Sequence, residues 1–171
     1  MIKPNIYVQT VFDIDYKKLK EKGIKLLCFD LDNTLDVPDK ITQNKDEKIE
    51  KLFKKLEEKE FEILIISNNS IKNRVGSFSK LYNIEYIENA KKPFQKKYKN
   101  SPTIKSFNKR EVAFIGDKIV TDVIGGNIFG STTILVDPII KGNTHWYTFI
   151  MNSSEKIFSA IINFKRGKYY E

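Results

Sequence analysis

Two aspartates separated by a single residue, Asp30 and Asp32, are the side chains of this sequence best placed to do chemistry. They follow residues 24–27, a short and mostly apolar run that is typical of a buried strand. Side chains two positions apart on a strand point to the same side, so both carboxylates can leave the strand end in one direction. Because unpaired buried charge is very costly, the pair predicts a counter-charge, which a magnesium ion (Mg2+) and a phosphate-bearing substrate would supply.

Two other interpretations of this motif involve no phosphate. An EF-hand calcium loop also begins Asp-x-Asp, but it needs Gly at its sixth position and Glu at its twelfth. Leu35 and Ile41 stand at those positions, which excludes a calcium loop of this kind. A plain turn, in which Asp32 and Asn33 cap the next segment, stays open because short motifs also arise by chance. The order of polar residues further along the chain must decide between a plain turn and a phosphate-binding site.

The elements that would position these residues alternate between strands and helices. Strands are expected at residues 24–27, 63–66, 84–87, 112–115 and 132–136, with an extended piece at 6–8. Helices are expected at residues 15–22, 71–81 and 121–129, and in a lysine-rich segment before Pro102. Asn44 and Glu47 have the spacing of a capping box, which predicts the start of another helix.

This alternation predicts an α/β fold with one doubly wound parallel sheet. The length of 171 residues fits a single domain over residues 1–171, with an N-terminal extension at 1–23 and a last helix at about 152–165. The segments between the strands are too short to hold a separate lid domain. We therefore expect an open site without a sizeable cap.

Polar residues follow four of the predicted strands, directly or within a few positions. They are Asp30/Asp32, Ser67/Asn68, Lys92 and Asp117/Asp122. In a doubly wound sheet, sites form beyond the carboxyl ends of the strands, so these groups are expected to converge. Each group alone has an ordinary explanation as a turn, a helix cap or a surface lysine. Their joint occurrence in this order favours a phosphoryl-transfer site.

Carboxylates of this kind can hydrolyse a phosphate monoester with the help of a cation. Magnesium prefers oxygen ligands, and Asp30, Asp117 and the backbone carbonyl of Asp32 can supply them. An ionised Asp30 can attack phosphorus without a separate base, and the resulting aspartyl phosphate must then be hydrolysed. Asp32 can protonate the leaving alcohol and afterwards deprotonate the attacking water.

The phosphate itself needs hydrogen bonds and positive charge. Ser67 and Asn68 can donate hydrogen bonds to its oxygens. Lys92 can place a positive charge where negative charge accumulates, because catalysis of this kind rests on positioning and electrostatics.

Together these motifs resemble those of the haloacid-dehalogenase (HAD) superfamily of phosphotransferases, and more closely its class III, YqeG-like phosphatases. The resemblance is carried by Asp30-x-Asp32-x-Thr34, Ser67-Asn68, Lys92-Pro93 and Gly116-Asp117-x-x-x-Thr121-Asp122. It covers nearly the whole chain and includes Asn69 with Arg74-Val75 and the run Gly125-Gly126-Asn127.

The resemblance implies a magnesium-dependent phosphatase with Asp30 as nucleophile and Asp32 as general acid and base. Asp117 would hold the metal, and Asp122 would be a supporting carboxylate near the metal or the lysine. The residues that would bind the substrate phosphate are Thr34, Ser67, Asn68 and Lys92. Lys118 stands where relatives often carry glutamine. We expect it to affect the tuning of the active site or the fit of the substrate without abolishing activity.

Composition limits the partners and the chemistry. Thirty basic and 22 acidic residues leave a net charge of +8, which favours anionic partners. The single Cys28 excludes an internal disulfide and a cysteine-based zinc site, and the single His145 excludes a histidine cluster. No apolar run approaches the roughly 20 residues of a membrane span, and no secretory signal is visible. We therefore expect a cytoplasmic protein.

The substrate is less constrained than the chemistry. Relatives in the YqeG-like group include phosphatidylglycerophosphate phosphatases, so the resemblance implies an anionic phospholipid as the first candidate. The aromatic stretch at residues 145–150 fits peripheral contact with the inner face of the membrane, although packing of these aromatics on the core ahead of the last helix is the favoured interpretation. Soluble sugar, nucleotide or protein phosphates are the alternative. A basic nucleic-acid-binding module with this fold is less favoured, because no aromatic and basic RNA motif is visible.

Overall fold

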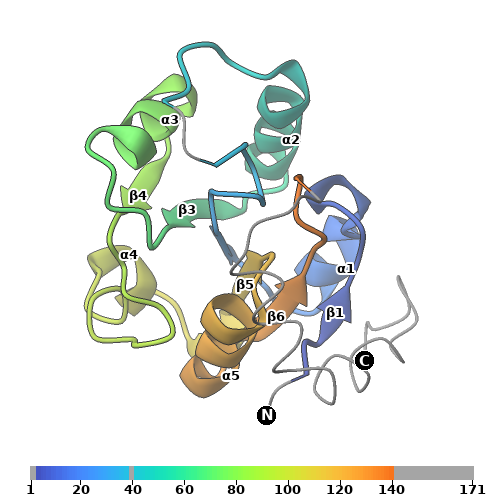
Figure 1. Cartoon of the computed structure of the whole chain (residues 1–171). Coiled ribbons are helices and arrows are strands. Elements are labelled where there is room, and N and C mark those ends of the chain that lie inside the picture. The colour runs from blue at the N-terminus through green and yellow to red at the C-terminus, as the bar shows by residue number, and fades with distance from the viewer. Residues whose placement is uncertain (1–2, 39–40, 141–171) are drawn as a thin grey trace.

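The computed structural model of the chain describes residues 3–38 and 41–140. The helix expected at about 152–165 and the aromatic stretch at 145–150 lie outside the described residues. Within them, six parallel strands form one sheet in the order β1-β6-β5-β2-β3-β4 (Figure 1). The strands are Ile6–Tyr7 (β1), Leu26–Phe29 (β2), Glu62–Ile66 (β3), Glu85–Ile87 (β4), Val112–Gly116 (β5) and Thr132–Leu135 (β6). The predicted α/β fold with a parallel sheet is confirmed.

Helices cover both faces of this sheet (Figure 1). They are Tyr16–Glu21 (α1), Glu47–Glu58 (α2), Arg74–Tyr82 (α3), Pro102–Lys105 (α4) and Gly125–Phe129 (α5). Successive side chains of β2 point to opposite faces of the sheet, as the pleat of a strand requires. Leu27 and Phe29 pack in the core formed with α1, α2 and α3, whereas Leu26 and Cys28 pack with residues of α4 and α5. This two-sided burial explains why β2 is apolar at every position.

The start of α2 differs from the prediction. The capping box expected at Asn44 and Glu47 is wrong, because Asp46 is the N-cap residue and its side chain accepts hydrogen bonds from the backbone N–H of Lys48 and Ile49. The backbone N–H of Asp46 donates to the Tyr82 hydroxyl at 2.7 Å. A tertiary contact with α3 therefore helps to set the helix start.

Two other expected helices also differ. The lysine-rich segment before Pro102 forms turns, in which the Lys97 ammonium donates to the backbone carbonyls of Glu88 and Asn89. The helix expected at residues 121–129 begins instead as a π-helical stretch, Ile119–Ile124, that leads into α5. This wider stretch holds Asp122 in a buried position directly after β5.

The N-terminal segment before Gly23 contains the expected extended piece, which is the edge strand β1, and the expected helix, which is α1. Ile6 pairs with Ile134 of β6 in parallel register. Between β2 and β3 the described residues form a loop and α2, and between β3 and β4 they form α3, so neither connection carries a cap domain. Across residues 3–38 and 41–140, no helix has the length and hydropathy that crossing a membrane demands.

The register of the sheet places the predicted site at its centre. Phe29, the last residue of β2, pairs with Ile115 of β5 on one side and Ile65 of β3 on the other. The backbone N–H of Asp30 then donates to the Ile115 carbonyl at 2.8 Å. The loops that follow β2, β3 and β5 therefore begin side by side.

Candidate active site

Asp30, Lys92 and Asp122 form a buried charge cluster at the carboxyl edge of the sheet. The Lys92 ammonium donates to Asp30 Oδ1 at 2.7 Å and to Asp122 Oδ1 at 2.5 Å. Burial by itself lowers the pKa of Lys92, but the carboxylates of Asp122 and Asp30 outweigh it and raise that pKa well above its ordinary value. Lys92 is therefore a fixed positive charge beside Asp30.

Asp117 adds a third carboxylate to this cluster. One oxygen from each of Asp30, Asp117 and Asp122 lies within 4.8 Å of the others. Burial, reinforced by the charges of Asp30 and Asp122, raises the pKa of Asp117 to about 7. Burial also raises the pKa of Asp122, against the opposing charge of Lys92. One lysine ammonium therefore faces more negative charge than it balances.

The three carboxylates differ in what their oxygens contact. Asp122 accepts from the Lys92 ammonium at Oδ1 and from the backbone N–H of Lys118 at Oδ2. Asp30 Oδ2 and Asp117 Oδ1 are buried and have no hydrogen-bond partner among the described residues. Buried polar atoms are rarely left unpaired, so Asp30 and Asp117 fit the role of ligands to a divalent cation, while Asp122 orients Lys92.

Asn68 is exposed and positions the backbone of Lys92. Its side-chain amide donates to the Lys92 carbonyl at 2.9 Å, and its side-chain oxygen accepts from the Lys92 backbone N–H at 2.7 Å. Both ends of the Asn68 side chain are thus engaged with one backbone segment. The side-chain NH2 of Asn68 carries a second N–H, so the contact to phosphate that the sequence predicts leaves both of these bonds in place.

The hydroxyls of Ser67 and Thr34 are both buried near the strand ends. Ser67 Oγ accepts from the backbone N–H of Asn69 at 3.1 Å. Thr34 Oγ1 has no hydrogen-bond partner within the described part of the chain. The structure therefore brings Asp30, Lys92, Asp117 and Asp122 into contact, whereas no hydrogen bond among the described residues joins either hydroxyl to them.

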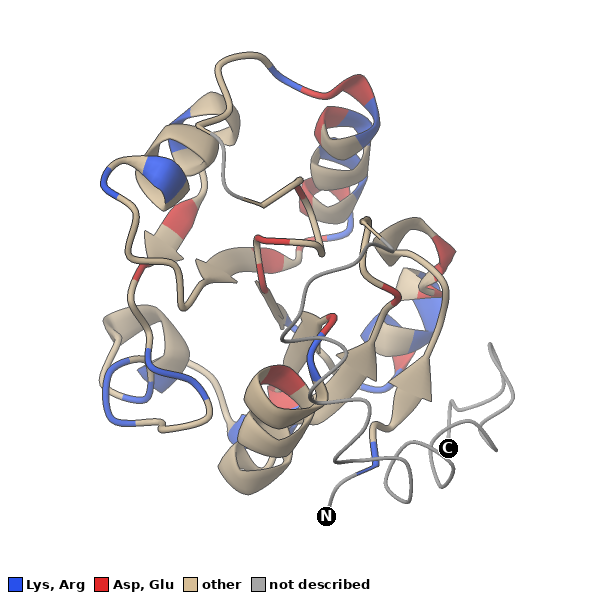
Figure 2. Cartoon of the chain, in the orientation of Figure 1, with Lys and Arg blue, Asp and Glu red and all other residues tan. Residues whose placement is uncertain are grey.

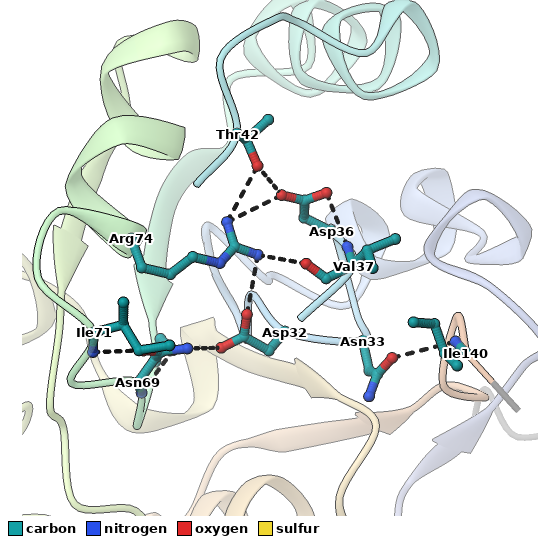
Figure 3. A network of polar contacts seen from close by, with 10 residues as sticks. Asp32, Asn33, Asp36, Val37, Thr42, Asn69, Ile71, Arg74 and Ile140 are labelled. Atoms are coloured by element: carbon teal, nitrogen blue, oxygen red, sulfur yellow. Dashed lines mark hydrogen bonds and ion pairs between the residues drawn. The ribbon is translucent and has the colours of Figure 1, made fainter. Parts of the chain in front are cut away.

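Asp32 is held from both sides by side chains that follow β3 (Figure 3). Its Oδ1 accepts from Arg74 Nη2 at 3.0 Å, and its Oδ2 accepts from the Asn69 side-chain amide at 2.7 Å. The Arg74 side chain is completely buried. Both oxygens of Asp32 are thereby oriented, and each keeps a second lone pair on which a transferred proton can sit.

Arg74 also fixes the loop that follows the two aspartates (Figure 3). It donates to Asp36 Oδ2 at 3.0 Å, to the Val37 carbonyl at 2.9 Å and to Thr42 Oγ1 at 3.2 Å. Sequence reasoning noted this arginine only as part of the resemblance and assigned it no role. One signal was present: a basic residue at the N-terminus of a helix opposes the helix dipole and needs another reason to be there.

Gly116 allows Asp122 to approach the end of β5. A Cβ atom on Gly116 would lie 2.3 Å from the carboxyl carbon of Asp122. Any larger residue at this position would displace the carboxylate that holds Lys92.

Comparisons with known proteins agree with this geometry. The family model described as "Mitochondrial PGP phosphatase" matches residues 1–141. "Probable phosphatase YqeG" of Bacillus subtilis (strain 168) is 34% identical over 158 residues, which are 92% of this chain and 90% of that protein. The chain belongs to the family of YqeG-like phosphatases. An uncharacterized protein from Listeria monocytogenes serotype 4b, 15% identical, superposes with a TM-score of 0.54 over 71% of this chain and 85% of that one, which supports the fold alone.

One residue of this YqeG-like phosphatase adds charge beside the carboxylates. Lys118 follows Asp117, and its positive charge opposes the rise in the pKa of Asp117 and of Asp122. Its backbone N–H also anchors Asp122. The backbone contact is open to any residue at this position except proline, so Lys118 differs from a glutamine here in the charge that it brings.

Proposed function

We propose that the chain, as one domain over residues 1–171, hydrolyses phosphomonoesters through an aspartyl phosphate on Asp30. The observation that carries this proposal is the buried, unpartnered Oδ2 of Asp30 beside the ammonium of Lys92. A carboxylate in this position can attack phosphorus, and the lysine beside it offsets the charge of the incoming phosphate.

Asp32 carries the proton in both halves of the reaction. As Asp30 bonds to phosphorus and the bond to the ester oxygen breaks, Asp32 passes a proton to that oxygen and the alcohol leaves. Water then attacks the phosphorus and gives a proton back to Asp32, while the bond between phosphorus and Asp30 breaks. Arg74 and Asn69 keep the Asp32 carboxylate aimed during both transfers.

The donor set fits magnesium, a hard cation that takes oxygen ligands. Asp30, Asp117 and the backbone carbonyl of Asp32 would hold it, and Asp122 would support the site by orienting Lys92. When bound, the ion neutralises charge on the phosphoryl oxygens. The hydroxyls of Ser67 and Thr34 would donate to the phosphate, with Lys92 as its fixed cation.

Phosphatidylglycerophosphate is the substrate that we propose first. The support is the family match over residues 1–141 and the lack of a cap domain between the described strands, which leaves room for a large headgroup. On this proposal the chain works peripherally at the inner face of a membrane. Soluble phosphomonoesters are the second candidate, because an uncapped site admits them too.

The test is phosphate release from phosphatidylglycerophosphate in mixed micelles, with and without magnesium, beside a panel of soluble phosphomonoesters. Asp30→Asn should abolish turnover of every substrate. Asp15→Asn is the matched control, since Asp15 caps α1 and asparagine caps a helix equally well. Turnover that persists in Asp30→Asn would overturn the mechanism. Turnover of soluble esters alone would keep the mechanism and discard the lipid.

A further inference from the structure

Exposed apolar side chains gather in the segments that follow the strands. Each of the six strands is followed by at least one large, exposed apolar residue, and together these residues define an apolar rim. The rim consists of Phe12, Ile41, Ile71, Phe94, Val120 and Ile139, in strand order β1, β2, β3, β4, β5 and β6. Among the other described residues, Ile140, next to Ile139, Tyr86, inside β4, and Ile128, on α5, are comparably exposed. Because the strands are parallel, the rim segments all begin at the edge of the sheet that holds Asp30.

Hydrogen bonds tie parts of the rim directly to the candidate site. The backbone N–H of Ile71 donates to Asn69, whose amide holds Asp32. On the other side, the backbone N–H groups of Ile139 and Ile140 donate to the carbonyl and the side chain of Asn33. Figure 3 shows Ile71 and Ile140 on either side of Asp32 and Asn33.

The apolar character continues into a shallow groove next to Thr34. This groove of about 340 Å³ is lined by Phe12, Leu35, Pro138 and Ile139 as well as by Thr34, and the charged residues Asp46, Lys48 and Asp137 also line it. Apolar side chains therefore extend from the rim toward Thr34, two residues after Asp32. Contiguous exposed apolar surface marks an interaction site more often than scattered residues do.

A basic loop completes the surface. Residues 91–99 contain five lysines and no acidic residue. Lys91, Lys96, Lys97 and Lys99 are exposed, and Phe94 between them is 76% exposed. Figure 2 shows basic residues gathered on the loop that leads from β4 to α4. The fifth lysine, Lys92, is buried and donates to Asp30, so the basic loop is joined to the candidate site through this residue.

We infer that the apolar rim and this basic loop dock the chain on an anionic lipid bilayer, with the Asp30 site facing the headgroups. The combination is the one that interfacial proteins use: apolar side chains enter the headgroup region while lysines pair with anionic lipids. Aliphatic residues such as Ile71, Val120 and Ile139 cannot stack on bases, which disfavours a nucleic acid. The inference deepens the proposed function, because it places the substrate phosphate at a bilayer surface.

The experiment is flotation of the full-length chain with vesicles of phosphatidylcholine, alone or mixed with phosphatidylglycerol. We expect binding to the mixed vesicles that weakens in high salt, and little binding to phosphatidylcholine alone. Phe94→Ser with Ile71→Ser should lower partitioning by about tenfold or more. Lys96→Gln with Lys99→Gln should lower it similarly.

Matched controls come from exposed residues away from the rim. Ile128→Ser on α5 and the pair Lys51→Gln with Lys54→Gln on α2 should bind mixed vesicles like the wild type. Urea unfolding midpoints establish that every variant is folded. Asp30→Asn should also float like the wild type, because docking needs no turnover.

Several results would overturn the inference. Flotation unaffected by the rim and lysine variants would assign binding to another segment, such as residues 141–171. A dimer that the rim variants dissociate, without vesicle binding, would assign the rim to a second copy. RNA binding lost in the lysine pair, without vesicle binding, would assign the basic loop to nucleic acid. Absence of flotation with retained turnover of soluble esters would discard docking alone, whereas flotation without any turnover would discard the proposed chemistry alone.

Discussion

Asp32 and Arg74, 42 positions apart in the chain, form an ion pair at 3.0 Å in which the arginine side chain is completely buried. Because Arg74 bonds at the same time to Asp36 and to the Val37 carbonyl, one guanidinium aligns the predicted acid and base with the loop that follows it. Arg74 is thus a positioning residue for Asp32.

Arg74→Lys should expose this positioning role. Lysine keeps the charge but lacks the planar fork that makes several directed bonds at once. We expect kcat for an alkyl phosphate to fall by about tenfold or more, with a smaller change in KM. The loss should be much smaller for an aryl phosphate, because an acidic phenol leaves without a proton from Asp32. Steady-state kinetics on both ester types measures the difference.

The Arg74 prediction has two comparisons. Asp32→Asn should show the same dependence on the leaving group, and Arg110→Lys, an exposed arginine, should change neither ester. Equal losses on both ester types in Arg74→Lys would mean that the arginine serves the fold alone. Arg74→Ala should also lower the free energy of unfolding by about 3 kcal/mol, since it leaves two largely buried carboxylates unpaired.

Magnesium should stabilise the folded chain by balancing the crowded carboxylates. At a magnesium concentration about 100 times the dissociation constant, linkage gives about 2.7 kcal/mol, which raises Tm by about 5 °C or more. Asp117→Asn should lose this shift. In EDTA its Tm should equal or exceed that of the wild type, because burial and the repulsion from Asp30 and Asp122, which raise the pKa of Asp117, no longer act on a charged group. Thermal unfolding with EDTA or magnesium measures both effects, and a full shift in Asp117→Asn would contradict the ligand assignment.

Gly116→Ala should disturb the site although it replaces no charged residue. The new Cβ would lie 2.3 Å from the Asp122 carboxyl carbon, so the carboxylate must move away from Lys92. We expect the free energy of unfolding to fall by about 1–3 kcal/mol and kcat to fall by about tenfold or more. Gly76→Ala is the comparison, because its Cβ would meet only the mobile end of the Tyr86 side chain at 2.9 Å. Urea unfolding and steady-state kinetics of both variants measure the changes in unfolding free energy and in kcat.

Tyr98→Phe should stabilise the chain. The Tyr98 hydroxyl is buried without a hydrogen-bond partner among the described residues, so its removal should add about 1 kcal/mol to the free energy of unfolding. Tyr16→Phe should act in the opposite direction, because the Tyr16 hydroxyl donates to the Val11 carbonyl at 2.8 Å.

The pH dependence of the Tyr98 variant follows from the same burial. Burial raises the pKa of Tyr98 from the ordinary 10.0 to about 12. Above 10.0 the unfolded phenol loses its proton while the folded one keeps it, so the stability of the wild type falls as pH rises through this window. The Phe variant should show a flatter alkaline slope. Urea unfolding on both sides of pH 10.0 measures it, and parallel slopes would contradict the prediction.

Local patterns located the strands, although β2 lies at Leu26–Phe29 and so two residues later than the predicted 24–27, but they were insufficient for the contacts between distant parts of the chain. The apolar runs of β2, β3 and β5 and the polar residues after them are readable because burial acts residue by residue. The cap of α2 was predicted two residues early, because Asn44 and Asp46 are equally good caps and the Tyr82 hydroxyl selects the second.

The same contrast between local patterns and distant contacts holds for the candidate site. Its residue types could be predicted from one strand end at a time, but their partners could not. The Asn68 side chain forms hydrogen bonds with the backbone of Lys92, 24 positions away in the sequence. The partners of Arg74 lie 32 to 42 positions away from it. Such pairings depend on the register of the sheet, which no local pattern encodes.

The Lys92 ammonium joins Asp30, 62 positions before it, to Asp122, 30 positions after it. Parallel strands pair only after long loops have closed, which makes such pairings slow. A nascent chain therefore carries no working site until β5 and the residues after it have been synthesised and have docked beside β2. During refolding, activity should return later than helical signal, so that enzymatic turnover reports the completion of folding.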